Sequence, residues 1–444
     1  MALSRALFRT CNAFFPFSDF IYILQLEEYS SRRFLKWMPR FFFRRNFQIR
    51  QHVEWTARAT IVCAGALILW LLGLALIWWL LPSLLIALWF LFAIPICVLG
   101  TNSALTIPFS LAHTRLRQKA AKNAAEFQKR GKIIVIAGSF GKTTTKHFLE
   151  QLARYNFRVQ MTPGNVNTPA GIAAWLLEGV KSGTDLLIIE ADGYSKREYQ
   201  ETGEMVHADI VVLTNVGDQH LERFGTRERL ADAIAEVVAS ARKDAIVVCT
   251  QETRDALRKN VFENRSLHIL TPDSEGGLSA SNAVNLSLAR ETARILNIPE
   301  VIITDSASKL ELPDRRQKPT TMYGYEAIDD SYNISWTTAQ AGIAAAADAA
   351  KASGKKLLVI TAGIMELNAE NCDKNFRLGE LLAKTADHTI VLRSMFAPEV
   401  VRGIGTHPHT IAPSLTTFLQ DAHAQFNPRE WFLLVQPEMH DLYY

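Results

Sequence analysis

The feature that most constrains the fold of this chain is a glycine-rich turn set between an apolar run and a helical pattern. The apolar run, Ile133–Ile136, is typical of a buried strand, and Phe148, Leu149 and Leu152 recur at helical spacing. The turn between them reads Ala137-Gly138-Ser139-Phe140-Gly141-Lys142-Thr143-Thr144. A strand, a glycine turn and a Lys-Thr pair that opens a helix form the arrangement that holds the phosphates of a nucleoside triphosphate. The sequence therefore predicts an α/β unit with a P-loop.

The residues of this turn carry distinct chemistry. Gly138 and Gly141 let backbone N–H groups approach phosphate oxygens, and the start of the following helix adds partial positive charge. Lys142 would reach the terminal phosphates, and the Thr143 hydroxyl would bind Mg²⁺. The loop is shorter than the common P-loop pattern, because Ile136 stands where that pattern has its first glycine. We predict ATP and Mg²⁺ as cofactors.

A second feature lies upstream of the P-loop. From Ala59 to Thr114 the chain has no Lys, Arg, Asp or Glu. The segments Ala59–Leu81 and Leu84–Leu105 each meet the length of about 20 residues that a membrane-spanning helix needs. Pro82-Ser83 between them suits a tight turn, so the pattern predicts a transmembrane helical hairpin. The alternative is a buried helical hairpin of a soluble protein.

Basic residues flank the apolar segments on both sides. Because positive flanks stay in the cytoplasm, both ends of the hairpin should face that compartment. The segment 1–56 also interleaves basic with aromatic residues, a mixture that could bind nucleic acid but next to membrane spans favours anionic lipid headgroups. We therefore expect membrane lipid and no nucleic acid among the partners. The flanking residues are Arg40, Arg44, Arg45, Arg50 and Arg58 before the hairpin and Arg115, Arg117, Lys119 and Lys122 after it.

The rest of the chain alternates short apolar runs with helical stretches, which argues for mainly parallel sheets covered by helices. A helix over Leu111–Arg130 should lead into the P-loop. We predict four parts: an interfacial segment (1–56), a transmembrane hairpin (57–107), an ATP-binding α/β domain (108–312) and a smaller Rossmann-like α/β domain (313–444). The predicted strands are Ile133–Ala137, Leu186–Glu190, Ile210–Thr214, Ala245–Cys249, Tyr325–Asp329, Leu357–Thr361, Thr389–Leu392 and Trp431–Val435.

A series of motifs in fixed order resembles the Mur ligase superfamily over about residues 130–395. Besides the short P-loop, Ile328-Asp329-Asp330-Ser331-Tyr332-Asn333 is similar to the D-D-S-Y-N motif of the MurF-type branch, which adds D-alanyl-D-alanine to the peptidoglycan precursor. The other matching segments are Thr162–Gly171, with its T-x-G-N-x-N start, the strand ending at Glu190, Thr214–Glu222, the pair Asn282 and Asn285, Pro313-Asp314-Arg315, and Met365-Glu366-Leu367-Asn368.

The resemblance implies roles for individual residues, and each also has a structural alternative, such as a helix cap for Asp329-Asp330 or a solvated strand end for Glu190. Lys142, Glu190 and His220 would be catalytic, and Thr143, Glu190 and His220 would hold the metal. Asn165, Asn167, Thr168, Tyr332 and Asn333 would face substrate. The nucleotide would be bound by Gly138, Ser139, Gly141, Lys142, Thr143, Thr144, Asn282, Asn285, Arg315 and Asp330.

This sequence departs from the family pattern at several places, among them the ending Gln436–Asp441, which replaces the family's basic K-G-S ending. Many members carry a carbamylated lysine that bridges to a second Mg²⁺, but the matching stretch here, Ala233–Glu236, has Ile234 at that position. An apolar side chain cannot bind Mg²⁺. Asn333-Ile334-Ser335-Trp336 lacks the proline of the family's N-x-N-P step. The space that holds the UDP-sugar domain in soluble members is taken by the apolar hairpin.

Together these features imply an ATP-dependent carboxylate–amine ligase that works through an acyl phosphate at the inner membrane of a bacterium, with its catalytic domains facing the cytoplasm. The expected reaction adds D-Ala-D-Ala, or a related amino acid or dipeptide, to a peptidoglycan precursor. Two alternatives stay open: a ligase acting on another polymer, such as poly-γ-glutamate, and a nucleotide-binding membrane protein without turnover. The D-D-S-Y-N run favours the first function, and Ile234 is the feature that supports loss of turnover.

Overall fold

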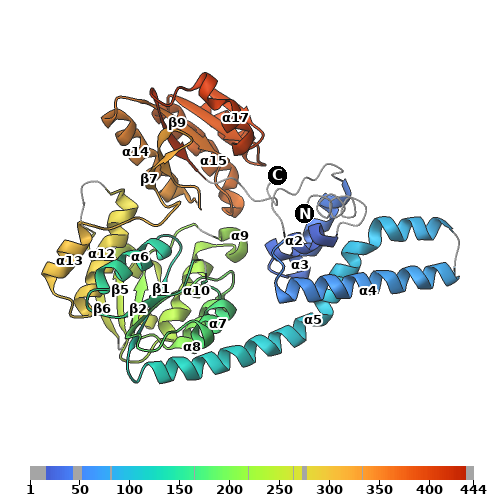
Figure 1. Ribbon diagram of the computed structural model, residues 1–444, viewed down its shortest axis with the longest axis horizontal. Coiled ribbons are helices and arrows are strands. Elements are labelled where there is room, and N and C mark those ends of the chain that lie inside the picture. The colour runs from blue at the N-terminus through green and yellow to red at the C-terminus, as the bar shows by residue number, and fades with distance from the viewer. Residues whose placement is uncertain are drawn as a thin grey trace. The chain divides into compact units, whose positions relative to one another are not determined.

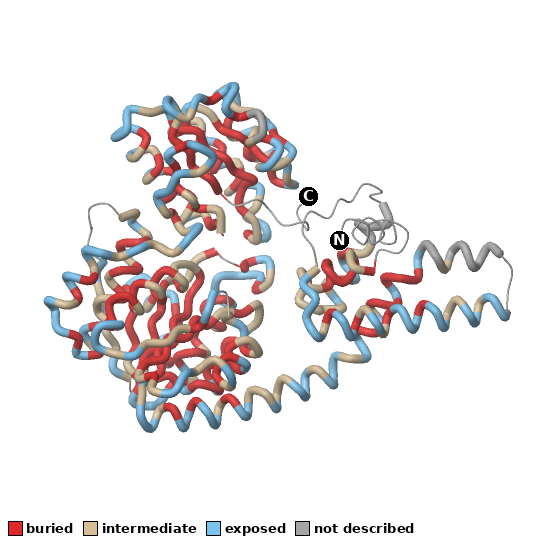
Figure 2. Tube along the Cα trace, in the orientation of Figure 1, coloured by how far each residue is buried: buried red, intermediate tan, exposed pale blue. Residues whose placement is uncertain are grey.

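The computed structural model describes residues 17–43, 53–80, 83–164, 166–218, 220–263, 265–272, 278–332 and 334–436. The chain divides into two compact units, of which the first ends at Thr114 and the second begins at Arg115 (Figure 1). Each unit has its own hydrophobic core, which Figure 2 shows as buried stretches of the tube. The predicted division into four parts stays a prediction.

The first unit is helical. Its core joins the two short helices to the two long ones, because Phe20 and Ile21 of the first helix and Phe34 of the second pack with Val62 and Val98. All five side chains are at most 1% exposed. The helices are α2 (Phe17–Leu26), α3 (Ser31–Phe43), α4 (Ala57–Leu80) and α5 (Ser83–Phe127), the last of which continues into the second unit.

Two helices in the described part of the chain are long and apolar enough to cross a membrane, over Ala57–Trp79 and Phe92–Phe127. The prediction of a helix end near Leu105 and a new helix from Leu111 was wrong, because α5 runs through both stretches without a break. Pro108 lies inside α5. A proline removes only one backbone hydrogen bond from a helix, and the residues around it here offer no further breaking signal.

A parallel sheet forms the first α/β part of the second unit, which we call the P-loop domain. Its strand order is β2-β3-β1-β4-β5-β6, and all the pairs are parallel. The strands are β1 (Lys132–Ala137), β2 (Val159–Met161), β3 (Leu186–Glu190), β4 (Ile210–Leu213), β5 (Ile246–Thr250) and β6 (Ser266–Leu270).

Helices cover both faces of this sheet. Side chains alternate along β1, so that Ile133 and Val135 join one core while Ile134 and Ile136 join the other. The first core contains side chains of α7 (Pro169–Glu178), α8 (Lys196–Val206), α10 (Arg227–Ala239) and the end of α5. The second contains side chains of α6 (Lys142–Ala153), α12 (Ala280–Ile295) and α13 (Glu300–Ala307). The short helices α9 (Leu221–Phe224), α11 (Gln251–Ala256) and η1 (Lys259–Phe262) complete the domain.

The second α/β part, which we call the C-terminal domain, has a mixed sheet of order β11-β10-β9-β12-β8-β7. Only the pair β7–β8 of this sheet is antiparallel in the described residues. Its strands are β7 (Lys318–Met322), β8 (Tyr325–Asp329), β9 (Lys356–Thr361), β10 (His388–Leu392), β11 (His409–Ala412) and β12 (Trp431–Val435). Its helices are α14 (Trp336–Ala352), η2 (Asn368–Glu370), α15 (Asn371–Thr385), α16 (Ala397–Ile404) and α17 (Leu415–Gln425).

The predicted fold class is confirmed, and every predicted strand lies on an observed one. The strands that the sequence did not reveal are β2, β6, β7 and β11. Their residues are mostly half-buried or exposed, so they lack the continuous apolar run that identified the central strands. β7 also contains Pro319, a residue found at sheet edges because it cannot donate to a neighbouring strand.

Candidate active site

The P-loop turn connects β1 to α6 and packs closely against its neighbours. Gly141 caps α6 with φ of 82°, and a Cβ built there would lie 2.1 Å from Asn285 Oδ1. Gly138 has φ of 138°, and its Cβ would lie 2.2 Å from Thr214 Oγ1. Both positions therefore need glycine, for the backbone conformation and for the space. The turn is further fixed by Phe140 N, which donates to Asn215 Oδ1 at 3.0 Å.

Lys142 begins α6 and is buried. Its Nζ donates to the carbonyl oxygens of Gly138 at 2.7 Å and Ser139 at 2.9 Å, and it forms an ion pair of 3.2 Å with Asp192 Oδ2. Burial by itself would raise the pKa of Asp192, but the charges of Lys142 and His220 outweigh it and hold that pKa well below its usual range. The ammonium is thus held at the phosphate loop by partners that an anionic phosphate could replace.

Thr143 and Glu190 form the second contact of the site. The Thr143 hydroxyl lies 3.1 and 3.0 Å from the two carboxylate oxygens of Glu190, which ends β3. The same hydroxyl accepts a hydrogen bond of 3.2 Å from Nη2 of Arg316. The guanidinium of Arg316 stacks on the ring of Tyr332 at 3.9 Å, and burial lowers the pKa of Arg316 while it raises that of Tyr332.

His220 lies between two carboxylates. Its Nδ1 is 2.5 Å from Glu366 Oε2 in the C-terminal domain, and its Nε2 is 3.9 Å from Asp192 Oδ2. Burial by itself would lower the pKa of His220, but Asp192 and Glu366 more than offset it and raise the pKa to about 9. The imidazole is therefore protonated at neutral pH, and both of its nitrogens are donors. A protonated ring offers a metal ion no lone pair, so in this state His220 would act on a metal only through water.

The oxygen atoms at Thr143 and Glu190 fit Mg²⁺. This ion prefers oxygen ligands and is commonly held by one or two carboxylates together with substrate phosphates. In the described residues no group of three or more His, Cys, Asp and Glu side chains could hold a metal ion. The protein ligands would therefore be few, and the phosphates of a nucleotide would complete the set.

These residues lie around a cavity of about 810 Å³. Asn282 and Asn285 of α12 line it, and Asn285 Oδ1 accepts a hydrogen bond of 3.3 Å from Thr145. Asp330 lies at another part of the lining, where burial raises its pKa well above the usual carboxyl value. The residues predicted from the sequence that line this cavity are Ser139, Gly141, Lys142, Thr143, Thr144, Asn167, Glu190, His220, Asn282, Asn285, Asp330 and Tyr332.

Three predicted residues stand apart from the lining of this cavity. Arg315 is exposed and donates to Ser331 Oγ at 2.9 Å and to the Ser331 carbonyl at 2.7 Å. The next residue, Arg316, is the one that lines the cavity. Thr168 caps α7 through a hydrogen bond with Gly171 N, and Gly138 shapes the loop. Asn165 and Asn333, two of the predicted substrate residues, lie outside the described residues.

Four residues of the site had no role predicted from the sequence. They are Lys146, Asp192, Arg316 and Glu366. Two of them could have been found from the sequence. Glu366 lies in a family motif, and Asp192 follows the predicted site residue Glu190 by two residues. Arg316 and Lys146 carried no such signal, because a single basic residue in a helix or a loop has no distinguishing spacing.

Comparison with known proteins agrees with this geometry. Residues 136–310 match the family model for the Mur ligase middle domain. The chain carries a Mur ligase middle domain. The resemblance to this superfamily that the motifs implied is thereby confirmed, and the matched region contains the P-loop, Glu190 and His220.

Several of the relatives among curated and solved proteins are of the MurF type. The chain is 25% identical over 276 residues to a UDP-N-acetylmuramoyl-tripeptide–D-alanyl-D-alanine ligase of Bacillus subtilis, over 56% of this chain and 59% of the relative. It thus spans less than two thirds of that relative's length. The crystal structure of MurF from Acinetobacter baumannii has a TM-score of 0.64 at 20% identity, covering 73% of this chain and 77% of that one. MurF from Thermotoga maritima in complex with ADP has a TM-score of 0.63 at 24% identity, covering 73% and 80%. These structures share the fold.

Proposed function

We propose that this chain is an ATP-dependent amide-bond ligase that adds D-Ala-D-Ala, or a related amino acid or dipeptide, to a peptidoglycan precursor. The observation that carries the proposal is the contact of Thr143 with both oxygens of Glu190, beside Lys142, at a cavity that Asn282 and Asn285 also line. In this arrangement a hydroxyl that would bind the metal lies beside a carboxylate and an ammonium that would bind phosphate. The relatives named above support the choice of substrates.

The reaction has two steps. A carboxylate oxygen of the precursor attacks the γ-phosphorus of ATP, ADP leaves, and an acyl phosphate forms. The amine then attacks the acyl carbon, phosphate leaves, and the ammonium proton is lost. Lys142 would exchange Asp192 and the loop carbonyls for phosphate oxygens and stabilise the charge that develops on them. Mg²⁺ would supply further neutralisation of that charge.

Other residues would position the reactants. Asn282 and Asn285 would bind the base of the nucleotide, and Asp330, whose pKa burial raises, would lie beside it. Asn167 and Tyr332 would face the substrates. Arg316 lines the cavity next to Thr143 and would replace the predicted Arg315 at the nucleotide.

We further propose that the ligase works at the bacterial inner membrane, facing the cytoplasm. Support comes from the two helices over Ala57–Trp79 and Phe92–Phe127 and from the exposed apolar side chains of α4, which include Leu72, Trp78 and Trp79. Such side chains would lie against lipid. The basic flanks of the hairpin would keep the P-loop domain on the side where ATP is available.

The alternative without turnover loses its support. It depended on Ile234 standing where many relatives have a metal-bridging lysine. Ile234 is fully buried in the first core of the P-loop domain and is not among the residues that line the cavity. Ile234 thus supplies no metal ligand, but the Thr143–Glu190 contact is formed without it.

The test is a ligation assay with the purified full-length protein, ATP, Mg²⁺, a muramoyl-tripeptide acceptor and D-Ala-D-Ala, read by mass spectrometry. The expected product gains the dipeptide mass with release of one phosphate. Depletion of the protein in cells should likewise cause accumulation of precursors that lack the terminal dipeptide. Unchanged precursor pools together with no product from any tested amine would reject the proposal.

A further inference from the structure

Lys146 lies one helical turn after Lys142 in α6 and is 0% exposed. Its Nζ is 2.9 Å from Glu190 Oε2. It also donates to the carbonyl oxygens of Thr162 at 2.9 Å and Gly164 at 3.2 Å. A lysine ammonium has three N–H donors, and here it has three acceptors. The group is buried, charged and fully hydrogen-bonded, which is the condition under which an ammonium is tolerated in a protein interior.

The acceptors belong to two separate segments. Glu190 ends β3, whereas Thr162 and Gly164 belong to the loop after β2. The two segments are also joined directly, because Glu190 N donates to Thr162 Oγ1 at 3.1 Å and Asp192 N donates to the Asn167 carbonyl at 3.0 Å. Lys146 therefore ties the carboxylate of the proposed metal site to the loop that leads to the proposed substrate residue Asn167.

Glu190 is 3% exposed, so its charge needs a close partner. Lys146 is the cation in direct contact with it, and Arg316 reaches it only through the Thr143 hydroxyl. Lys146 contacts Oε2, while Thr143 contacts both oxygens. The carboxylate is thus shared between a fixed cation on one side and the proposed metal position on the other.

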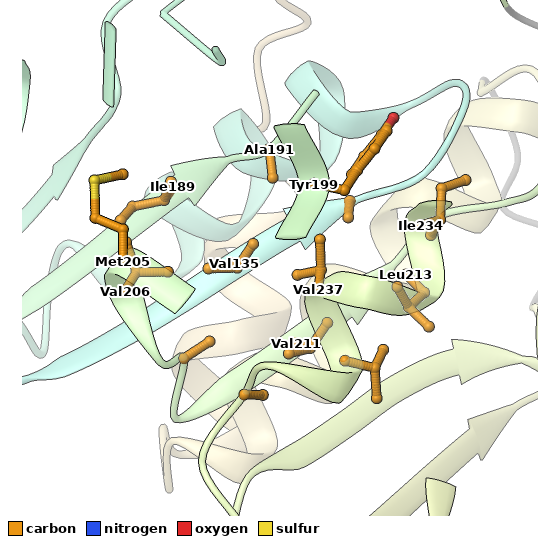
Figure 3. Close-up of a cluster of buried hydrophobic side chains, with 14 of the residues drawn as sticks. Val135, Ile189, Ala191, Tyr199, Met205, Val206, Val211, Leu213, Ile234 and Val237 are labelled. Carbon is orange, nitrogen blue, oxygen red and sulfur yellow. The ribbon is translucent and has the colours of Figure 1, made fainter. Parts of the chain in front are cut away.

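A second metal ion has no protein ligand at the position where many relatives hold one. Figure 3 shows Ile234 among Leu213, Val237 and Tyr199 in the hydrophobic core. Within the described residues no cluster of metal-binding side chains supplies a substitute.

We propose that Lys146 is a positioning residue whose ammonium fixes Glu190 and the 162–164 loop and takes the place of a second divalent cation beside that carboxylate. The proposal rests on the proposed function, because Glu190 is a metal ligand only if the chain uses a metal–nucleotide complex. It follows that the nucleotide-bound protein binds one divalent ion.

The experiment measures Mn²⁺ binding to the full-length protein with ADP, without acceptor or amine, by electron paramagnetic resonance. Lys146→Gln keeps a hydrogen-bond donor but removes the charge, and Lys146→Arg keeps the charge. We expect one Mn²⁺ in the wild type and in Lys146→Arg. Lys146→Gln should bind Mn²⁺ about tenfold more tightly, or bind a second ion, because a positive charge next to Glu190 is gone. Lys129→Gln is the control, since Lys129 is 71% exposed and pairs only with Glu126 among described residues.

Two results would overturn the proposal. One is a folded Lys146→Gln variant with wild-type Mn²⁺ affinity and stoichiometry, since a lysine that only packs would leave both unchanged. The other is two Mn²⁺ ions in the wild type, which decides the matter even where Lys146→Gln does not fold. If the wild type binds no Mn²⁺ with ADP, the proposed function itself fails, and this proposal fails with it.

Discussion

At the scale of single residues, the site is organised by charged side chains that partner one another. Lys142, Asp192, His220 and Glu366 form a continuous series of contacts across the two α/β domains of the second unit. Each is buried or nearly so, which makes their mutual charges effective because little water screens them. Lys142 is the cation at the P-loop, and His220 is the cation between two carboxylates. The role of each can be tested by a single substitution.

Lys142→Ala should lower ATP-dependent ligation about a hundredfold or more, the usual cost of removing a group that stabilises transition-state charge. No other ammonium in the described part of the loop is free to replace it, because Lys146 is fully engaged. The measurement is product formation at saturating ATP. Lys129→Ala serves as the control and should retain wild-type turnover. Wild-type product formation by Lys142→Ala would contradict the proposed role.

Glu366→Gln should lower the pKa of His220 from about 9 towards its ordinary value. A histidine whose pKa is raised on folding adds stability that is complete below its unfolded pKa of about 6.5 and is lost as pH rises through the folded pKa. The melting temperature of the variant should therefore fall furthest below that of the wild type below about pH 6.5. The difference should shrink as pH rises past 9, where His220 is neutral in both.

The exposed Glu430 of the same domain provides a control for this series. Glu430→Gln should give a melting temperature that follows the wild type across the whole pH range. A difference between Glu366→Gln and wild type that stays constant from pH 6 to 10 would show that Glu366 does not act through the charge of His220.

At the scale of elements, the P-loop works because β1, α6 and α12 approach one another closely. Gly141 is the point of contact, since its missing Cβ leaves room for Asn285 of α12. Asn282 and Asn285, which we propose bind the nucleotide, are thereby held next to the P-loop.

Gly141→Ala should weaken ADP binding and lower the melting temperature. The substitution costs roughly 1–2 kcal/mol for an L-residue at positive φ, and its Cβ would also displace Asn285. Gly354→Ala is the matched control, because Gly354 has φ of 67° with no atom within 4 Å of its added Cβ. Both variants share the backbone strain, so only Gly141→Ala should lose ADP affinity in calorimetry. Equal ADP affinities of the two variants would contradict the prediction that the close approach of Gly141 to Asn285 is needed for ADP binding.

Ile234→Lys should destabilise the P-loop domain rather than restore a metal-bridging lysine. The family pattern aligns residue 234 with a metal-bridging lysine, but its side chain lies in the core between α10 and the sheet. Burying an unpaired ammonium there would cost several kcal/mol. Ile234→Val should cost only about 1 kcal/mol. A stable Ile234→Lys protein with a lower Mg²⁺ requirement, measured at raised bicarbonate, would contradict this account.

At the scale of the whole molecule, one continuous helix, α5, joins a helical unit to the unit that contains the Mur ligase middle domain. The first unit contains a buried polar group, Asn102, which donates to the Tyr29 carbonyl at 2.7 Å and to Ser31 Oγ at 3.1 Å. Arg58 donates to the same side chain at 3.3 Å. These bonds connect α3, α4 and α5, so the helices form a defined unit instead of a simple anchor.

The proposed topology can be tested by cysteine labelling in a background from which the native cysteines are removed. A cysteine at Glu54 or Lys129 should react with an impermeant reagent only after the cells are opened, because basic residues flank both spans. A cysteine at Ser83, between the spans, should react from outside. Labelling of position 54 or 129 in intact cells, or extraction of the protein by carbonate without detergent, would reject the membrane proposal.

Features that depend on local pattern could be predicted from the residues alone. A continuous apolar run identifies a central strand because both of its faces are buried, and Gly138 and Gly141 identify the loop because no other residue fits there. The order of the motifs along the chain then implied the family, which the middle-domain match confirmed. The uninterrupted charge-free stretch from Ala59 to Thr114 likewise predicted the two long helices.

Which side chains meet could not be predicted in this way, because it depends on how the folded elements pack. Arg315 and Arg316 are equivalent in sequence, yet a positive φ of 60° at Arg315 turns that residue to solvent and leaves Arg316 at the cavity. Lys146 carries no signal of its own, because its partners on β3 and in the 162–164 loop are brought to it by the fold. Ile234 belongs to the core because α10 presents that face to the sheet. Motif spacing fixes a position along the chain, whereas a side chain's direction depends on the packing of the element that carries it.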